Sequence, residues 1–257
     1  ELIKKIRKFS KDSKFPIMID EEGETVSRLS KIINHNFSQK LFGDMYKDNP
    51  KVALIVYKNY INNLTVLLKK IGININTVPV LDVIRKKTHK IIGNRSFSNN
   101  PSIVKELGRV CVKQYKLNKL GTVIKHIPGH GCTDFDSHLK TPNVKLTYKN
   151  LNKIDFFPFK SNSSQFAMTA HIIYSKIDKN NVATFSNKII SQIIRKKIRF
   201  KGILISDDIS MKALKHDLVT NAKKSLTAGC NIVLYCAGNY KDSSKLLKEL
   251  PFIDNFT

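Results

Sequence analysis

Short apolar runs rich in β-branched residues recur along the chain, and a stretch with helical spacing follows most of them. The six runs are Pro16–Asp20, Asn74–Asp82, Gly121–His126, Phe166–His171, Gly202–Asp207 and Asn231–Cys236. Near-continuous apolar strands that alternate with helices are typical of a parallel sheet covered on both faces. The pattern therefore predicts an α/β fold built from βα units.

Five of the six runs end in an ionisable residue: Asp20, Asp82, His126, His171 and Asp207. Such groups cost free energy to bury without partners, so they need a common polar environment. In a parallel sheet the carboxyl ends of all strands lie on one side, and in a barrel they form the mouth of the active site. We therefore predict a (β/α)8 TIM-type barrel, with an open doubly wound sheet as the alternative.

A barrel of this type needs eight strands, and the pattern supplies about six of the eight. Because Glu1–Lys11 has the pattern of a helix that leads into the first run, we expect the first two βα units to precede residue 1. No internal repeat or Gly/Ser linker divides the rest. We expect residues 1–257 to form a single, N-terminally truncated catalytic barrel domain.

Composition narrows the choice of partners. Hydrophobic residues make up 41% of the chain, yet no apolar run is long enough to cross a membrane. The net charge of +25 would suit a nucleic-acid partner, but the lysines are scattered and only seven of the 45 basic residues are arginine. We attribute this charge to general residue usage and expect no nucleic-acid partner. The alternative is a non-catalytic basic protein that binds nucleic acid or an anionic glycan.

The four cysteines form no C-x-x-C pair and no compact disulfide framework. This usage is typical of a reducing compartment, and we therefore expect a cytoplasmic protein.

The densest chemistry lies in residues 125–142, which hold three histidines and two aspartates between prolines and glycines. A glycine-containing loop can carry Asp136 and His138 toward a substrate and away again. Metal binding by His126, His130, Asp134, Asp136 and His138 is a second interpretation of the same residues. Their spacing fits no standard zinc signature and Lys125 adds a cation beside His126, so we expect no metal.

Several strand ends share their order and spacing with a known family. The segments are Ile19-Asp-Glu-Glu-Gly23, Pro79-Val-Leu-Asp-Val83, Ile92-Gly-Asn-Arg-Ser-Phe97, Lys125-His-Ile-Pro-Gly-His-Gly131 with Asp136-Ser-His138, Met168-Thr-Ala-His171 and Ile205-Ser-Asp-Asp-Ile-Ser-Met211. On these motifs the chain resembles bacterial β-N-acetylhexosaminidases of glycoside hydrolase family 3. It departs from the family pattern at Glu24 and Thr25, where a glycine and an arginine are usual, which puts the local turn in question.

The resemblance implies a retaining mechanism, which needs a nucleophile and a proton donor on opposite sides of the anomeric carbon. It assigns the nucleophile to Asp207. Alternate strand residues face opposite ways, so Asp208 cannot share that orientation, and we expect it to cap the following helix. The resemblance also assigns acid/base catalysis to His138, oriented by Asp136. Attack by the substrate's own acetamido oxygen, with Asp207 only orienting it, is the alternative route.

The resemblance further implies substrate binding by Asp20, Arg28, Arg95, Lys125 and His126, whose donors and acceptors suit sugar hydroxyl and acetamido groups. Asp82 and His171 are expected either to brace the mouth or to touch the substrate. The implied enzyme is an exo-β-N-acetylglucosaminidase that acts on muropeptides in cell-wall recycling. It would need no cofactor, take a small carbohydrate substrate and act as a monomer.

Overall fold

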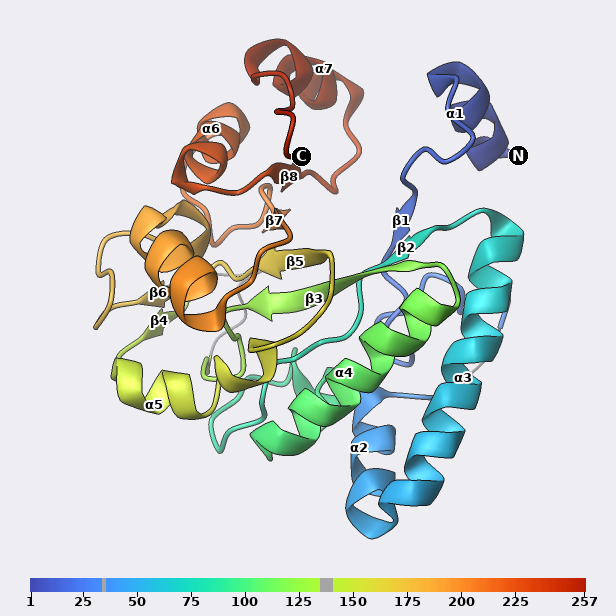
Figure 1. Ribbon diagram of the computed structural model, residues 1–257. Helices are drawn as coiled ribbons and strands as arrows, with labels where there is room; N and C mark the ends of the chain where they lie inside the picture. The colour runs from blue at the N-terminus through green and yellow to red at the C-terminus, as the bar shows by residue number, and fades with distance from the viewer. Residues whose placement is uncertain (34–35, 135–140) are drawn as a thin grey trace.

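A computed structural model describes residues 1–33, 36–134 and 141–257 (Figure 1). The α-helices are α1 (Leu2–Ser10), α2 (Gln39–Asp48), α3 (Pro50–Ile71), α4 (Pro101–Leu117), α5 (Tyr148–Lys153), α6 (Leu218–Ala228) and α7 (Tyr240–Glu249). Shorter 3-10 turns are η1 (Gly93–Arg95), η2 (Phe157–Phe159) and η3 (Ala183–Phe185), and η4 (Ile189–Ile198) is π-helical. The strands are β1 (Met18–Ile19), β2 (Ile75–Asn76), β3 (Gly121–Ile127), β4 (Asn143–Val144), β5 (Phe166–Thr169), β6 (Ile173–Tyr174), β7 (Ile203–Asp208) and β8 (Ile232–Leu234).

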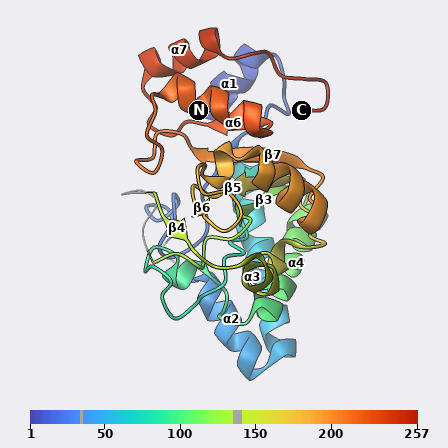
Figure 2. The ribbon, with the colours of Figure 1, turned by 90° about the vertical axis from the view of Figure 1, so that its left-hand side faces the viewer.

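Six strands form one parallel sheet in the order β1-β2-β3-β5-β7-β8. These are the six runs read from the sequence, so the predicted α/β architecture and strand count are confirmed. The sheet curls into part of a barrel, with α3 and α4 packed along its outside (Figure 1). Figure 2 views the molecule from the side toward which the strands of the sheet point, so this is the mouth end. Within the residues described, no helix has the length and apolar character to cross a bilayer.

Two details of the predicted strands were wrong. Residues 74–82 form only the short strand β2, because Pro79 has no N–H to continue the ladder; a single bridge from Val80 to Lys125 follows. The sequence also did not reveal the parallel pair β4 and β6. Each of these strands has only two residues, too few to produce an alternating pattern.

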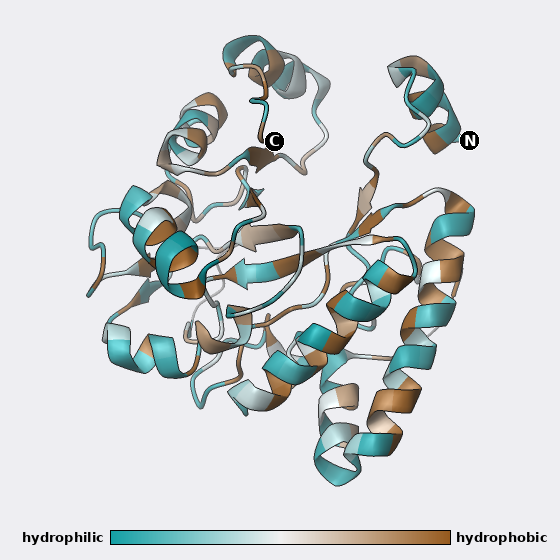
Figure 3. Cartoon of the chain, viewed as in Figure 1, coloured by the Kyte–Doolittle hydropathy of each residue, from teal (hydrophilic) through white to brown (hydrophobic). Residues whose placement is uncertain are grey.

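The sheet has an inner and an outer apolar face. Val123, Met168 and Ile205 form an inner cluster with parts of β1, β2 and β8. Their neighbours Ile124, Ala167 and Leu204 belong to the main core, which the surrounding helices cover. Figure 3 shows the mixed teal and brown surface of α3 and α4, as expected for helices with one face in that core. Side-chain alternation along the strands therefore separates the barrel interior from the helix-covered core.

Helix α3 illustrates how local sequence and packing agree. The Asn49 side chain accepts a hydrogen bond from the Val52 N–H, Pro50 starts the helix, and Gly72 ends it with φ of 93°. Leu68 points into the main core and is fully buried, whereas Val66 is 61% exposed.

We predict that Leu68→Ala destabilises the protein by about 2–5 kcal/mol, because it removes buried methyl groups and leaves a cavity. The matched control Val66→Ala should change stability by less than about 0.5 kcal/mol. Guanidinium unfolding followed by circular dichroism measures both free energies. Equal effects of the two substitutions would contradict the assigned core face of α3.

Candidate active site

Side-chain alternation places a row of polar residues at the mouth. The inner apolar face includes one residue from each of four strands: Met18, Ile75, Val123 and Ile205. Two positions further along, on the same face, lie Asp20, Thr77, Lys125 and Asp207. The Lys125 Nζ lies 2.8 Å from both Asp20 Oδ1 and Thr77 Oγ1. Residues 20, 77 and 125 thus meet across β1, β2 and β3.

A buried charge network extends this row. The Lys125 ammonium also pairs with Glu22 at 2.5 Å, and the Glu22 carboxylate accepts two hydrogen bonds from the Arg95 guanidinium at 2.7 and 2.9 Å. Burial alone would raise the pKa of Glu22, but Lys125 and Arg95 hold it below its usual value. Burial likewise opposes the charge of Asp20, and Lys125 again lowers its pKa. Both carboxylates are therefore ionised around neutral pH.

Glu22 is a site residue that our sequence analysis missed. It stands within the quoted Asp20-Glu-Glu22 motif, but nothing in the spacing shows which of the two glutamates turns inward. In the structure Glu22 reaches the charge network. Glu21 instead accepts hydrogen bonds from the backbone N–H groups of Arg28 and Leu29. Their roles differ because the chain turns sharply after Glu22, through a bridge between Gly23 and Val26.

This turn contains Glu24 and Thr25, the two residues that depart from the family pattern. Gly23 has φ of 103° and Glu24 has φ of 23°, so both residues lie in the left-handed region. The exposed Glu24 carboxylate accepts a hydrogen bond from Asn94 Nδ2 at 3.3 Å. The turn therefore forms without the second glycine and links to the loop that carries Arg95.

Asp82 braces His126. Its Oδ2 lies 2.7 Å from His126 Nδ1, and its Oδ1 accepts the backbone N–H of His130 at 2.6 Å. The fully buried Asp82 has a pKa held below its usual value: burial opposes ionisation, but His126 outweighs it. The carboxylate thus fixes the imidazole so that Nε2 faces Arg95 at 3.5 Å. Of the two roles considered for Asp82, the contacts fit bracing.

Asp207 lies at the end of β7 and is half-buried. Burial alone would raise its pKa, but His126, the hydrogen bond from the Asp208 N–H and the Lys125 ammonium lower it. The carboxylate is therefore ionised and remains accessible from the mouth. The sequence interpretation grouped these residues at one end of the sheet, and the structure brings them into one electrostatic cluster.

His171 supports the strand that carries Asp207. Its Nε2 lies 3.0 Å from the Asp208 carbonyl oxygen and its Nδ1 lies 2.7 Å from the Thr184 hydroxyl. A carbonyl can only accept, so Nε2 carries the proton and Nδ1 accepts from the hydroxyl. The ring is fully buried, and this burial lowers its pKa. His171 therefore braces the site as a neutral imidazole.

Asp208 does not cap the following helix, contrary to our expectation. Its carboxylate accepts hydrogen bonds from the Ser210 N–H and hydroxyl at 3.0 and 2.7 Å, within the turn after β7. Asp217 caps α6 instead. The connection between strand and helix is too long for Asp208 to reach the first helical N–H groups. The two aspartates nevertheless make different contacts, since the Asp207 carboxylate accepts the Asp208 N–H and the Asp208 carboxylate accepts from Ser210.

Arg28 lies at the rim. Its side chain is 63% exposed, and NH2 lies 3.8 Å from Asp20 Oδ2. It can therefore move toward a bound molecule while Asp20 stays fixed by Lys125.

Asp136 and His138 lie outside the residues that the structure describes. The segment that leads to them is firmly packed: a Cβ at Gly131 would lie 1.9 Å from the Val83 carbonyl oxygen. His130 Nδ1 lies 3.0 Å from the Thr133 hydroxyl.

Among residues 1–33, 36–134 and 141–257, no three His, Cys, Asp or Glu side chains are grouped to hold a metal. His126 directs Nε2 at a guanidinium, which disfavours a cation there.

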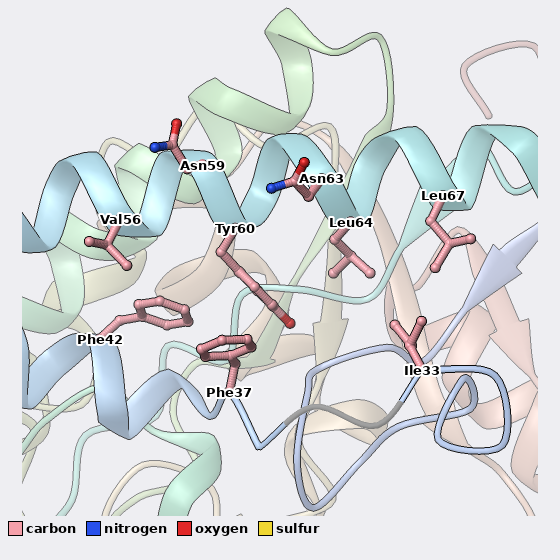
Figure 4. A pocket seen from close by; sticks show the side chains of 9 residues that line it. All are labelled: Ile33, Phe37, Phe42, Val56, Asn59, Tyr60, Asn63, Leu64 and Leu67. Carbon is pink, nitrogen blue, oxygen red and sulfur yellow. The ribbon is translucent and has the colours of Figure 1, made fainter.

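A separate cavity of about 480 Å³ lies between α3 and the side chains of Ile33, Phe37 and Phe42 (Figure 4). Phe37, Phe42 and Tyr60 line it together with aliphatic and asparagine side chains, and among the described residues that line it there is no carboxylate, imidazole or ammonium group. Such a surface cannot supply acid/base or nucleophilic chemistry. The charged mouth is therefore the candidate active site.

The buried histidines predict a pH dependence of stability. Burial lowers the pKa of His130 to about 4, whereas an unfolded histidine titrates near 6.5. Between these values the unfolded chain binds the extra proton, so stability falls as pH decreases. We expect a loss on the order of 3 kcal/mol from pH 7 to pH 4 from His130 alone.

Urea unfolding at several pH values measures this loss, and NMR titration of the His130 ring identifies its source. The urea-unfolded chain is the control, where the same ring should titrate near its ordinary value. A folded-state midpoint at pH 6 or above would contradict the assignment.

Comparison with known proteins matches this site to a family. Residues 1–253 match the model of the glycosyl hydrolase family 3 N-terminal domain. A β-hexosaminidase of Nitrosomonas eutropha is 32% identical over 92% of this chain and 68% of its own length. The crystal structure of NagZ from Neisseria gonorrhoeae with N-trifluoroacetyl-D-glucosamine superposes with a TM-score of 0.87 at 29% identity, over 98% of this chain and 76% of that one.

A family 3 β-N-acetylglucosaminidase from Paenibacillus sp. str. FPU-7 has a TM-score of 0.82 at 25% identity, over 95% and 46% of the two chains. These matches support an enzyme over a non-catalytic basic binding protein. The chain belongs to glycosyl hydrolase family 3, and it is a glycoside hydrolase of the β-N-acetylhexosaminidase type.

Proposed function

We propose that this protein is a retaining exo-β-N-acetylglucosaminidase with Asp207 as its nucleophile. The observation that carries the proposal is the half-buried Asp207 carboxylate, kept ionised by His126, the Asp208 N–H and Lys125 at the mouth of the curled sheet. A retaining glycosidase needs such an anion beside the anomeric carbon. The β-N-acetylglucosaminidases among the structural relatives support the choice of sugar.

The terminal sugar would be held by the network around Asp20. The Asp20 carboxylate accepts hydrogen bonds from vicinal hydroxyl groups, while Arg28, Arg95 and His126 donate to hydroxyl or acetamido oxygens. Lys125 would donate to the sugar in exchange for one of its contacts with Asp20, Thr77 and Glu22, and the other contacts keep these groups in place. Asp82 maintains the His126 orientation.

The reaction proceeds in two balanced steps. Asp207 attacks the anomeric carbon while His138 protonates the glycosidic oxygen, so the leaving group departs as an alcohol and a glycosyl ester forms. His138, oriented by Asp136, then takes a proton from water, which attacks the same carbon and releases the Asp207 carboxylate. Histidine suits both steps because its ordinary pKa lies near neutral pH. Direct attack by the acetamido oxygen is the competing route.

We extend the proposal to the whole fold and its setting. Residues 1–257 would form the single catalytic domain of a (β/α)8 barrel whose two further strands lie outside these residues. In the described part of the chain β1 and β8 each pair with one neighbouring strand, and this, with the 76% coverage of the NagZ chain, supports the arrangement. The substrate would be a muropeptide of cell-wall recycling, handled without a cofactor by a cytoplasmic monomer.

Replacement of the nucleophile tests the proposal. We expect Asp207→Asn to lower kcat for p-nitrophenyl N-acetyl-β-glucosaminide by at least about 10³-fold, because the covalent step is lost. Asp208→Asn is the matched control and should cost less than about tenfold, since among the described residues the Asp208 carboxylate accepts hydrogen bonds from Ser210 and the Cys236 N–H, whereas His171 and Asp207 contact its backbone.

Trapping distinguishes the two routes. Mass spectrometry after incubation with a 2-fluoro sugar should find the label on the peptide that contains Asp207. Label on another carboxylate, or full activity of the Asp207 variant, would remove Asp207 from the nucleophile's role.

A second prediction tests the proton donor. His138→Gln should lower kcat/KM for a disaccharide by about 10²–10⁴-fold, because the departing alkoxide needs a proton. The loss should be much smaller for a 2,4-dinitrophenyl glycoside, whose leaving group departs without protonation. Steady-state assays of both substrates give the ratio, and an equal loss for the two would argue against acid/base catalysis by His138.

A further inference from the structure

The cavity of about 480 Å³ beside α3, here called the α2–α3 cavity, has two opposed walls (Figure 4). One wall is a single face of α3, because the residues that form it recur every three or four positions. These residues are Val56, Asn59, Tyr60, Asn63, Leu64 and Leu67. Ile33, Phe37 and Phe42 form the other wall, and their side chains are directed toward α3 (Figure 4). A molecule between the walls would contact both α2 and α3.

Both walls are held in place by contacts outside the cavity. On α3, Leu68 is fully buried in the main core. On α2, the Gln39 side chain exchanges two hydrogen bonds with the backbone of Val80, each of 3.1 Å. A Cβ at Gly43 would lie 1.7 Å from the Phe97 carbonyl oxygen, so α2 is in close contact with that segment. Closing the cavity by moving α2 toward α3 would break these contacts, and the cavity is therefore preformed.

Three aromatic rings form one end of the cavity. The Phe37 ring centroid lies 5.3 Å from that of Tyr60 and 6.2 Å from that of Phe42, and the Phe42 and Tyr60 centroids are 5.1 Å apart. Phe37 is nevertheless 44% exposed, so part of this apolar surface is in contact with water. Covering it with an apolar molecule would release that water, which is favourable.

The polar groups of the lining are few and neutral. Asn59 and Asn63 are exposed and lie about one turn apart on α3, where their amides can donate or accept a hydrogen bond. The described residues that line the cavity include no charged side chain. A charged ligand would lose its water there without gaining a counter-charge, so the lining favours a neutral one.

We propose that the α2–α3 cavity is a second binding site, which takes a neutral, largely apolar small molecule with a ring system and one carbonyl or hydroxyl group. Its volume is in the range of about 300–1,000 Å³ that is usual for such pockets, and a mostly apolar lining with a few polar groups is their usual composition. The ring system would pack on the aromatic end, and Asn59 or Asn63 would bind the polar group. The lining shares no residue with the charged mouth, so the two sites are separate.

Titration with N-phenyl-1-naphthylamine tests the site, because this neutral ligand fluoresces strongly only in apolar surroundings. We expect saturable binding of one molecule per chain. The affinity should change by less than about twofold when salt is raised to about 0.5 M, since no charge takes part.

A variant that fills the cavity should lose this binding. Val56→Trp places an indole between the walls, and Val56 is only half-buried, so the main core stays intact. We expect at least about tenfold weaker binding. The matched control is Ile55→Trp, a neighbouring residue that is 62% exposed and does not line the cavity; it should keep the affinity. Circular dichroism checks that both variants fold, and Leu67→Trp fills the other end of the cavity if Val56→Trp does not.

Energy transfer locates the bound ligand. The chain contains no tryptophan, so each variant has a single donor. Emission from the Ile55→Trp variant should be strongly quenched by the bound ligand. Leu247→Trp, at an 83% exposed position of α7 at the other end of the molecule, should show much weaker transfer (Figure 1).

The absence of saturable binding by the unsubstituted protein would overturn the site, as would equal affinities of Val56→Trp and Ile55→Trp. Equal energy transfer in the Ile55→Trp and Leu247→Trp variants would place the ligand elsewhere and would also overturn it. An affinity that falls as protein concentration rises, with a doubled mass in sedimentation, would show that a second copy of the chain covers the cavity in place of a small molecule.

Discussion

The alternation of side chains along parallel strands is the constraint on which the site depends. On four strands, a residue of the inner apolar cluster is followed two positions later by a polar residue of the mouth. Because the strands run parallel, these polar residues gather at one end of the sheet, where the long Lys125 side chain reaches Asp20 and Thr77. A one-residue shift of β3 would turn Lys125 away from Asp20 and leave its carboxylate without its main counter-charge. The fold and the charge network are therefore specified together.

The buried charges follow from this placement. Lys125 and Arg95 both form an ion pair with Glu22, and burying any one of these charges without a partner would cost free energy. Together these three residues form a network of ion pairs. Through Lys125 it fixes the position of Asp20, and through Arg95 it contacts His126. Such preorganisation has a chemical use, because groups already in place need not reorganise when charge develops on the sugar.

Most of the site could be predicted from strand ends. Asp20, Lys125, His126 and Asp207 stand at the carboxyl ends of runs with clear β-branched character, so topology alone groups them. Glu22 was missed because it follows a turn whose geometry the sequence does not give. The strand predicted over 74–82 was too long, since Pro79 interrupts the ladder; the irregular chain beyond it positions Asp82 beneath His126.

The sequence by itself determined the α/β class, the six parallel strands and the side of the sheet on which the chemistry lies. These features depend on local periodicity and on a topological rule, both of which can be read along the chain. Only the tertiary structure decided which carboxylate meets which cation. It turned Glu22 rather than Glu21 toward Lys125, set Asp82 and His171 as braces, and left Asp208 in its own turn. Those choices depend on contacts between residues far apart in sequence, which no local pattern encodes.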